Sequence, residues 1–336
     1  MSFLYDPDAM HPIDRAVEIL RTGGLVAFPT ETVYGLGADA TNPRAVRRIF
    51  AAKDRPATNP LIAHVADEQA ARRYAADWPQ EASILARKFW PGPLTLVVGK
   101  SAVIATEVSA GRQTVGLRAP DHPLALEMLR AFGGAVAAPS ANRSTRVSPT
   151  TAQHVRDELG PSVDLILDGG PCRVGIESTV LDLSGDLPTI LRPGAVTRHE
   201  IESLIGPVEL FQGTADIATA ASSPGQHAIH YAPRAPAYRF SREDMEPLLR
   251  WLIGREGRPA AAMFVGETPL SLKTVSFQLS IEAPTHPDNY ARELYAALRR
   301  LDLPGVDGIL IEMPPDRPEW AAVRDRIMRA TRPLPL

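Results

Sequence analysis

Short apolar runs alternate with amphipathic stretches as far as residue 206. The apolar runs cover residues 24–28, 61–65, 94–98, 114–119, 135–138, 163–167, 178–183 and 189–192. Runs of this length between glycines and prolines predict buried strands. Helical spacing appears between them, first in Ile13, Ala16, Val17 and Leu20, and again over residues 67–90 and 123–132. Strands that alternate with helices predict an α/β or α+β sheet domain.

The first apolar run ends in a polar, glycine-rich loop. Pro29 has no N–H to donate, so it should end the strand. The loop is predicted to run from Thr30 to Gly37. Active sites of α/β folds are commonly built on loops at strand ends, so this loop is a candidate site.

A helix is predicted directly after this loop, because Asn42 suits an N-cap and Pro43 the first helical position. Lys53 lies seven residues after the apolar Val46, on the same helical face, so it should point into the protein. Two interpretations remain open. The lysine either covers apolar surface with its stem, or it joins Arg55 in an anion site.

Other predicted strands end in the same kind of polar or cationic loop. Arg118 and Arg192 end two strands, and Pro139 to Arg143 follow a third. Ser148 and Pro149 are predicted to begin a helix that ends at Gly160. Cations beside hydroxyl and amide groups suit a polyanion such as a triphosphate. The residues are Lys53, Arg55, Arg118, Arg143 and Arg192, with Thr30, Ser140, Asn142 and Ser178. His64, in run 61–65, either packs in the core or faces the same pocket.

The composition changes to Ala, Ser, Thr, Gly and Pro between about residues 212 and 236, which is typical of a linker. His230 and Tyr231 stand in this stretch and carry more chemistry than a spacer requires. Apolar runs at 260–265 and 306–311, with helical faces at 291–301 and 320–327, predict a small second α/β domain. The length of 336 residues also favours two domains.

Composition and charge exclude several classes of protein. A net charge of −3 argues against wholesale wrapping of nucleic acid. The single cysteine, Cys172, excludes an internal disulfide framework and fits a reducing cytoplasm, as does an N-terminus without a signal-peptide pattern. We expect no membrane span, because no eighteen-residue apolar run occurs. The P-loop, dinucleotide-binding, nucleophile-elbow and zinc-site motifs do not occur either.

Several motifs, in order along the chain, resemble those of the YrdC-like domain. They are FPTETVYGLGADA at 28–40, KDR at 53–55, SAN at 140–142, and also FWPGPLTLVV, VGLRAP, GIESTVLDL and LRPGA. The segment SPGxxxxHYAP and the C-terminal domain are similar to the long, Sua-type members. These are L-threonylcarbamoyladenylate synthases. The resemblance extends from about residue 10 to 206 and continues through the linker, so it is more specific than any single motif.

The resemblance implies a fold and a reaction. We expect a YrdC-like catalytic domain over 1–207, with a twisted open sheet and helices around a concave cationic cleft. A linker or lid over 208–236 and a Rossmann-like α/β domain over 237–336 would follow. The implied reaction joins L-threonine, bicarbonate and ATP, releases pyrophosphate, and serves formation of N6-threonylcarbamoyladenosine next to the anticodon of ANN-decoding tRNAs. A separate threonylcarbamoyl-transferase complex acting on tRNA would be the partner.

The resemblance also implies roles for individual residues. Threonine would be held by Thr30, His64, Arg118, Ala138 and Ser178. ATP would be held by Lys53, Arg55, Asn59, Thr114, Ser140, Asn142, Ser148, Arg192, His230 and Tyr231. Lys53 and Arg55 would be catalytic through charge stabilisation, without a covalent nucleophile. Mg²⁺ would bind through the phosphates, with no protein ligand and no organic cofactor.

Two further questions concern the linker and the class of function. We expect residues 223–233 to fold over the cleft and keep water from a labile anhydride, and the alternative is a linker packed on the domain surface. The competing functions are a carbamoyltransferase of the YrdC-like type and a protein that binds double-stranded RNA. The first should carry accessory segments, and the charge of −3 weighs against the second.

Overall fold

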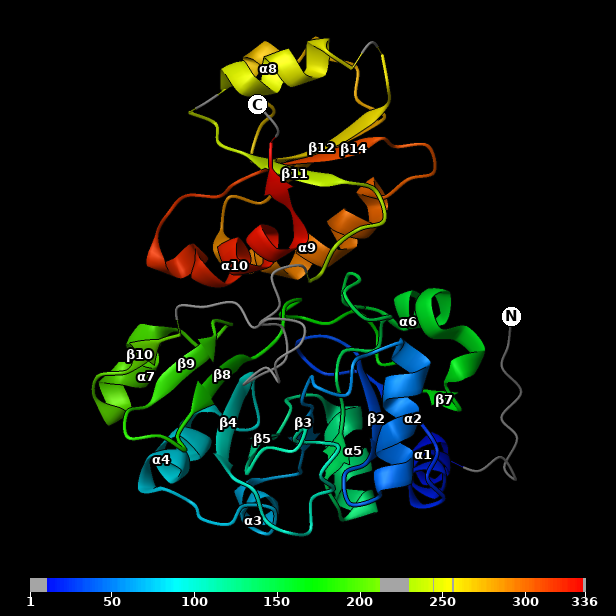
Figure 1. Ribbon diagram of the computed structural model, residues 1–336, viewed down its shortest axis with the longest axis vertical. Helices are drawn as coiled ribbons and strands as arrows, with labels where there is room; N and C mark the ends of the chain where they lie inside the picture. Colours follow the sequence, from blue (N-terminus) through cyan, green and yellow to red (C-terminus); the bar gives the residue numbers. More distant parts are fainter. Residues whose placement is uncertain (1–10, 212–229, 244, 256, 335–336) are drawn as a thin grey trace.

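The computed structural model describes residues 11–211, 230–243, 245–255 and 257–334. Two domains stand one above the other in Figure 1, each built around its own sheet. The first contains a ten-stranded mixed sheet, and the second a five-stranded sheet in which every pair is parallel. The α/β fold class with a parallel C-terminal sheet is therefore confirmed.

The first domain follows the predicted alternation of strands and helices. Its strands are β1 Val26–Phe28, β2 Gly35–Asp39, β3 Ile62–His64, β4 Leu94–Gly99, β5 Thr114–Arg118, β6 Val136–Ala137, β7 Leu165–Ile166, β8 Thr179–Asp182, β9 Thr189–Arg192 and β10 Glu209–Leu210. Its helices are α1 Pro12–Arg21, α2 Pro43–Lys53, α3 Glu68–Arg72, α4 Gln80–Phe89, α5 Pro123–Phe132, α6 Ala152–Leu159 and α7 Arg198–Ile205, with a 3₁₀ turn, η1, at Gly160–Ser162. The sheet order is β10-β9-β8-β4-β5-β3-β6-β2-β1-β7, so β3 and β5 are central.

Sheet register brings distant polar residues to one edge. β3 and β5 are parallel, and their pairing sets His64 beside Arg118. β8 and β9 are antiparallel, with Val180 opposite Arg192, so Ser178 just before β8 lies at the end of β9. The turn between β1 and β2 adds residues 29–34, because Phe28 pairs with Gly35. Loops far apart in the sequence thus meet at this edge.

Three sequence predictions were wrong in detail. The stretch 67–90, predicted to be helical, contains two helices, α3 and α4, separated by residues 73–79. The polar loop predicted to reach Gly37 ends earlier, because β2 begins at Gly35. Residues 35–38 are all buried, and the two glycines conceal this buried strand in the sequence. The helix predicted to begin at Ser148 begins at Ala152, where the hydroxyl of Thr151 accepts a hydrogen bond from the His154 N–H. Ser148 is unavailable as a cap because its hydroxyl donates to Glu177.

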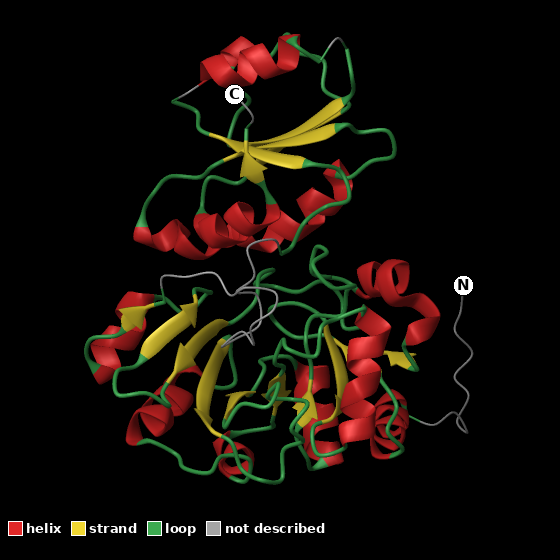
Figure 2. Cartoon of the chain, viewed as in Figure 1, coloured by secondary structure: helices red, strands yellow, loops and turns green. Residues whose placement is uncertain are grey.

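The second domain is a three-layer sandwich (Figure 2). Its elements are β11 Ala237–Phe240, α8 Met245–Ile253, β12 Ala260–Val265, η2 Leu270–Leu272, β13 Leu279–Ala283, α9 Pro287–Leu301, β14 Gly308–Glu312, η3 Pro318–Trp320, α10 Ala321–Ala330 and β15 Arg332–Pro333. Side chains alternate across the sheet. Ala262 and Phe264 pack on the α8 side, and Ala261 and Met263 pack on the α9 and α10 side.

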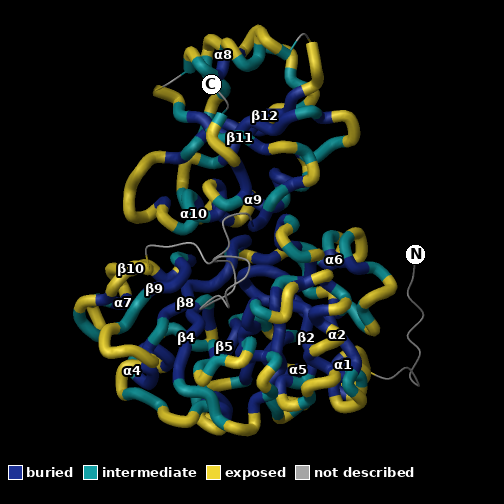
Figure 3. The backbone as a smooth tube through the Cα atoms, in the orientation of Figure 1, coloured by how far each residue is buried: buried dark blue, intermediate teal, exposed yellow. Residues whose placement is uncertain are grey.

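The layer formed by α9 and α10 faces the first domain (Figure 1). Val33, Val147 and Ile176 of the first domain are buried in the same apolar cluster as these helices. Gly175 has a φ of +84°, and a Cβ there would lie 2.4 Å from the Cα of Arg292 in α9. The backbones therefore approach as closely as a glycine allows. Figure 3 shows buried chain on both sides of this contact.

The sheets also locate the ends of the two domains. The last strand of the first sheet, β10, pairs with β9 and ends at Leu210, three residues past the expected boundary at residue 207. The second sheet starts at Ala237. In the part of the chain that the structure describes, no helix combines the length and apolar character needed to span a lipid bilayer.

Candidate active site

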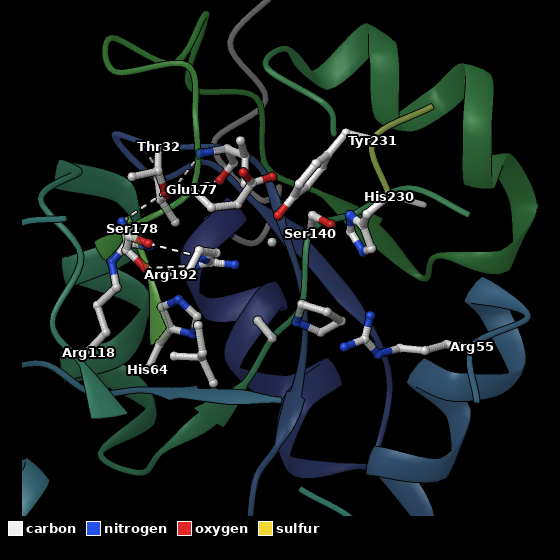
Figure 4. Close-up of a pocket in the computed structure, with 16 residues that line it drawn as sticks. Thr32, Arg55, His64, Arg118, Ser140, Glu177, Ser178, Arg192, His230 and Tyr231 are labelled. Atoms are coloured by element: carbon white, nitrogen blue, oxygen red, sulfur yellow. Dashed lines mark hydrogen bonds between the residues drawn. The ribbon is translucent and has the colours of Figure 1, made fainter. Parts of the chain in front are cut away.

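A polar pocket opens at the sheet edge where these loops meet (Figure 4). It is lined by Thr30, Thr32, Val33, Gly35, Arg55, Ile62, His64, Arg118, Ala138, Pro139, Ser140, Glu177, Ser178, Arg192, His230 and Tyr231. Most of these polar side chains are buried. Buried polar groups normally have partners, so the exceptions among them show where a ligand could bind.

Arg118 forms one wall at the end of β5. Its Nη2 lies 2.7 Å from Oε1 of Glu31 and donates to Oγ1 of Thr32 over 2.9 Å. Its Nε donates to the Gly92 carbonyl over 3.3 Å. Among the described residues, no hydrogen-bond partner occupies Nη1. The guanidinium is therefore fixed in orientation while one nitrogen stays free for an acceptor.

His64 stands beside Arg118 at the end of β3. Burial first, and the charge of Arg118 second, lower the pKa of His64 to about 3. Its ring meets Phe28 edge to face at 5.7 Å. Nδ1 is buried and finds no partner within the described chain. The imidazole is therefore neutral at physiological pH and adds a polar ring without adding charge.

Ser178 and Arg192 form the adjoining wall. The Ser178 hydroxyl is 2.8 Å from Oγ1 of Thr95 and accepts from Nη2 of Arg192 over 3.2 Å. Nε of Arg192 donates to the Ser178 carbonyl over 3.1 Å. Burial lowers the pKa of Arg192 below its ordinary value. A second buried guanidinium is thus held at the pocket by hydroxyl and carbonyl oxygens.

Lys53 and Arg55 are buried cations whose described partners are neutral. The Lys53 ammonium donates to the carbonyls of Ser140 and Asn142. Arg55 donates to the carbonyls of Asn59 and Pro60, over 3.4 and 3.1 Å. Burial lowers the pKa of Lys53 well below its usual range and that of Arg55 to about 10. Within the described chain, neither cation forms an ion pair with a carboxylate, which suits a site for an anion.

His230 and Tyr231 close the pocket opposite its walls (Figure 4). Their ring centroids lie 4.1 Å apart. Burial first, and Arg55 second, lower the pKa of His230. The His230 Nδ1 and the Tyr231 hydroxyl are buried without partners among the described residues. Of the segment 223–233 expected to cover the cleft, residues 223–229 lie outside the described chain, and these two residues line the pocket.

Comparison with known proteins gives this pocket a family. A family model described as "Telomere recombination", for Sua5, YciO and YrdC proteins, matches residues 18–194. A second, "Threonylcarbamoyl-AMP synthase, C-terminal domain", matches residues 196–331. A threonylcarbamoyl-AMP synthase of Bacillus subtilis is 40% identical over 321 residues, covering 95% of this chain and 92% of that protein.

This chain belongs to the threonylcarbamoyl-AMP synthase family. A synthase of Pyrococcus abyssi is also 40% identical, over 94% of this chain and 93% of its own. The crystal structure of P. abyssi Sua5 complexed with L-threonine matches 96% of this chain and 95% of its own, with a TM-score of 0.87 and 38% identity. The resemblance drawn from the sequence motifs is therefore confirmed for both domains.

The pocket gathers many of the residues that the family resemblance singled out. Of the expected threonine ligands, it is lined by Thr30, His64, Arg118, Ala138 and Ser178. Of the expected ATP ligands, it is lined by Arg55, Ser140, Arg192, His230 and Tyr231. The Thr30 hydroxyl already donates to the Val33 carbonyl over 2.6 Å, so it shapes the turn after β1. The pocket lining thus contains all the residues expected to hold threonine and half of those expected to hold ATP.

The other expected ATP ligands lie outside the pocket lining. Thr114 lines a neighbouring pocket that shares Ile62 with the first. Asn59 and Asn142 are buried, and the Oδ1 atom of each is without a hydrogen-bond partner in the described chain. Ser148 is buried and donates to Glu177, and Lys53 holds the 140–142 loop from behind. Of these five residues, Lys53 and Ser148 contact groups of the pocket walls from outside the lining.

Sequence reasoning missed Thr32 and Glu177 as pocket residues. Thr32 lies two positions after Thr30, and Glu177 directly precedes Ser178, each within a recognised motif. A carboxylate immediately before the apolar run at 178–183 was an available signal, because such a group at a buried strand end needs a partner. That partner comes from the second domain, which the local pattern could not reveal.

Proposed function

We propose that this chain makes threonylcarbamoyl-AMP from L-threonine, bicarbonate and ATP, with release of pyrophosphate. As a member of the synthase family, it is a transferase acting on a nucleotide. The observation that carries the assignment of substrates is the combination, in one buried pocket, of the free Nη1 of Arg118 with the Arg55 guanidinium, whose hydrogen-bond partners in the described chain are neutral carbonyls. The Arg118 nitrogen suits a carboxylate, and the Arg55 guanidinium suits phosphates.

The part of the pocket that would bind threonine lies against Arg118. Its unoccupied Nη1 would receive the amino-acid carboxylate, since Glu31 and Thr32 already fix the other nitrogen. Neutral His64 and the Ser178 hydroxyl stand beside it. The crystal structure of P. abyssi Sua5 complexed with L-threonine supports a threonine site in the family. Holding the carboxylate would leave the amine directed into the pocket.

The nucleotide end lies toward Arg55. Arg55 and Arg192 would neutralise phosphate oxygens, and Ser140 would help to fix their orientation. Mg²⁺ would arrive as part of the ATP substrate. In the described ranges, no three His, Cys, Asp or Glu side chains gather as a metal site. Both carboxylate oxygens of Glu177 are already engaged by protein groups. The ion would screen the phosphate charge.

The reaction then needs positioning rather than a covalent nucleophile. The threonine nitrogen attacks the carbon of bicarbonate and a C–N bond forms. The C–OH bond of bicarbonate breaks, and its hydroxyl group leaves as water with a proton from the amine. A carbamate oxygen attacks the α-phosphorus, the bond to the β-phosphate breaks, and pyrophosphate leaves. Lys53 keeps the 140–142 loop in place, and Arg55 stabilises charge on the departing phosphates.

The product is a mixed anhydride that water would hydrolyse. His230 and Tyr231 over the pocket would limit the access of water. We further propose that a separate cytoplasmic complex transfers the threonylcarbamoyl group to tRNA, giving N6-threonylcarbamoyladenosine in ANN-decoding tRNAs. The single cysteine fits that compartment.

The test is release of pyrophosphate by the purified chain with ATP, Mg²⁺, bicarbonate and threonine. Release should require threonine, stop with excess EDTA and return with added Mg²⁺. Mass spectrometry should detect threonylcarbamoyl-AMP. Carbamoyl phosphate consumption without a threonine requirement would instead indicate a carbamoyltransferase. Tight, salt-sensitive binding of double-stranded RNA with no turnover would indicate an RNA-binding protein.

A further inference from the structure

Glu177 sits where the pocket wall meets the second domain. It immediately precedes Ser178 and is itself part of the pocket lining. Its Oε1 accepts from the Ser148 hydroxyl over 2.6 Å. Its Oε2 accepts from the Tyr295 hydroxyl and from Nε of Arg326, each over 2.8 Å. One carboxylate of the first domain is thus held by α9 and by α10.

Arg326 in α10 links this wall to His230 and Tyr231, the two residues that cover the pocket and are called the cover below. It is fully buried, and its guanidinium carbon lies 5.3 Å from the centre of the Tyr231 ring. Nη1 donates to Asp325 over 2.7 Å, while Nε binds Glu177. The same side chain therefore contacts the wall through hydrogen bonds and the cover through its cationic face.

Tyr231 is held in an unusual backbone conformation by these contacts. Its φ of +61° is left-handed, a conformation that tyrosine rarely adopts. Its ring lies 5.6 Å from that of Tyr295, and the His230 N–H donates to the Arg329 carbonyl over 3.0 Å. The second domain thus surrounds the cover residues on several sides and maintains their conformation.

We propose that the C-terminal domain acts in the reaction by positioning the His230–Tyr231 cover over the cationic side of the pocket, through Tyr295 and Arg326 bound to Glu177. The three are positioning residues. The proposal rests on the proposed function and gives the second domain a role in nucleotide binding. His230 lies close enough to Arg55 to feel its charge, so a displaced cover should weaken binding of ATP.

Glu177 is suited to this role and not to proton transfer. Both its oxygens are occupied by donors from Ser148, Tyr295 and Arg326. Burial alone would raise its pKa, but the charges of Arg326 and Arg192 and the Ser148 hydrogen bond lower it to about 2. The carboxylate therefore stays ionised and fixed, as a bridge between domains requires.

The test compares two conservative variants of α9. Tyr295→Phe removes only the hydroxyl that binds Glu177 and keeps the ring beside Tyr231. Tyr290→Phe is the matched control, since Tyr290 is equally buried and its hydroxyl has no partner in the described chain. We expect Tyr295→Phe to raise the KM for ATP by about tenfold, the scale of a hydrogen bond to a charged group. Tyr290→Phe should leave it unchanged.

The outcomes separate positioning from folding. A variant that only loses folded protein lowers kcat in proportion to the folded fraction and keeps the wild-type KM for ATP. That result for Tyr295→Phe, or equal KM values in the two variants, would overturn the proposal. Absence of threonine-dependent pyrophosphate release by the wild type would instead defeat the proposed function itself.

A second measurement uses Glu177→Gln alone and combined with Tyr295→Phe. If both residues act through one bridge, the double variant should have nearly the KM for ATP of the more impaired single variant. If the fold-change in KM of the double variant equals the product of the two single fold-changes, Tyr295 acts independently of Glu177, which would contradict the bridge. If Glu177→Gln does not fold, the comparison of Tyr295→Phe with Tyr290→Phe decides the question alone.

Discussion

The pocket and the domain interface both bury cations, but they surround them differently. Arg55 in the pocket lining and Lys53 beside it contact backbone carbonyls. At the interface, Arg326 contacts the carboxylates of Glu177 and Asp325. Burial lowers the pKa of Arg55 to about 10. Burial opposes the charge of Arg326 as well, but Tyr231, Glu177 and Asp325 raise its pKa.

The difference separates a binding site from a structural contact. A buried cation without a counter-charge is costly, and a bound anion relieves that cost. A buried cation with two carboxylates is already compensated and offers little to a ligand. On the proposed function, the pocket keeps positive charge for phosphate, whereas at the interface the charge joins two domains. Four predictions test this contrast.

The largest effect should follow removal of the interface cation. Arg326→Met leaves Glu177 buried without its guanidinium, which should destabilise the protein by about 3–5 kcal/mol. Urea unfolding followed by circular dichroism measures the change. The control is Arg250→Met, because that side chain is 70% exposed and its ion pair with Glu246 is on the surface. Equal stability of the two variants would contradict the structural role of Arg326.

Removal of a pocket cation should lower activity and leave folding stability unchanged. Arg55→Met should lower kcat/KM about 100- to 1,000-fold, as loss of a charge-stabilising group does, without loss of folding stability. Threonine-dependent pyrophosphate release and thermal unfolding measure the two quantities. Arg47→Met, on the exposed face of α2, serves as control because its side chain is 57% exposed. A destabilised but fully active Arg55→Met variant would reverse the contrast.

A phosphate ligand should stabilise the protein through the pocket cations alone. Inorganic tripolyphosphate at a hundred times its Kd should add about 2.7 kcal/mol to the free energy of unfolding. The gain should disappear in Arg55→Met and persist in Arg250→Met. Thermal shift and calorimetry measure it. A gain retained by Arg55→Met would place the anion site elsewhere.

The effect that is smallest per step, about 1.4 kcal/mol for each pH unit, concerns pH. The pKa of His64 is lowered to about 3 by burial and by Arg118. Below about pH 6.5, His64 is therefore protonated in the unfolded chain but stays neutral in the folded chain. Stability from this group is complete above pH 6.5 and falls by about 1.4 kcal/mol per unit as the pH drops toward 3. His64→Gln should flatten the loss between pH 6.5 and 4.5 in urea unfolding curves. An unchanged slope would mean that His64 protonates freely in the folded state.

Most elements of the first domain could be predicted because their signals are local. Asn42 and Pro43 mark the start of α2, and the structure shows the Asn42 side chain accepting from the N–H groups of Arg44 and Ala45. The spacing of Val46 and Lys53 correctly predicted that the lysine is buried. Helix caps and apolar stripes depend on neighbours within one or two turns, so a linear pattern contains them.

Site residues were predictable as a set but not as individual contacts. Motifs identified Arg118 at the end of β5, Ser178 just before β8 and Lys53 at the end of α2. The sheet brings the two strand ends together, and packing of α2 places Lys53 beside them. The atoms that Lys53 contacts belong to residues 140 and 142, which lie 87 and 89 positions away. Ser148 illustrates the limit, because it has the local features of a helix cap and instead donates to Glu177.

The sequence by itself determined the alternation of strands and helices, the two domains and the family, because short-range periodicity and motif order encode them. Tertiary structure alone decided which buried cations keep free charge. Lys53, Arg55 and Arg326 look alike in the sequence as basic residues on or beside amphipathic helices. Their roles diverge because Arg326 meets Glu177, 149 residues away, whereas the partners of Lys53 and Arg55 are carbonyl oxygens. A charge is neutralised only by the groups that packing sets around it.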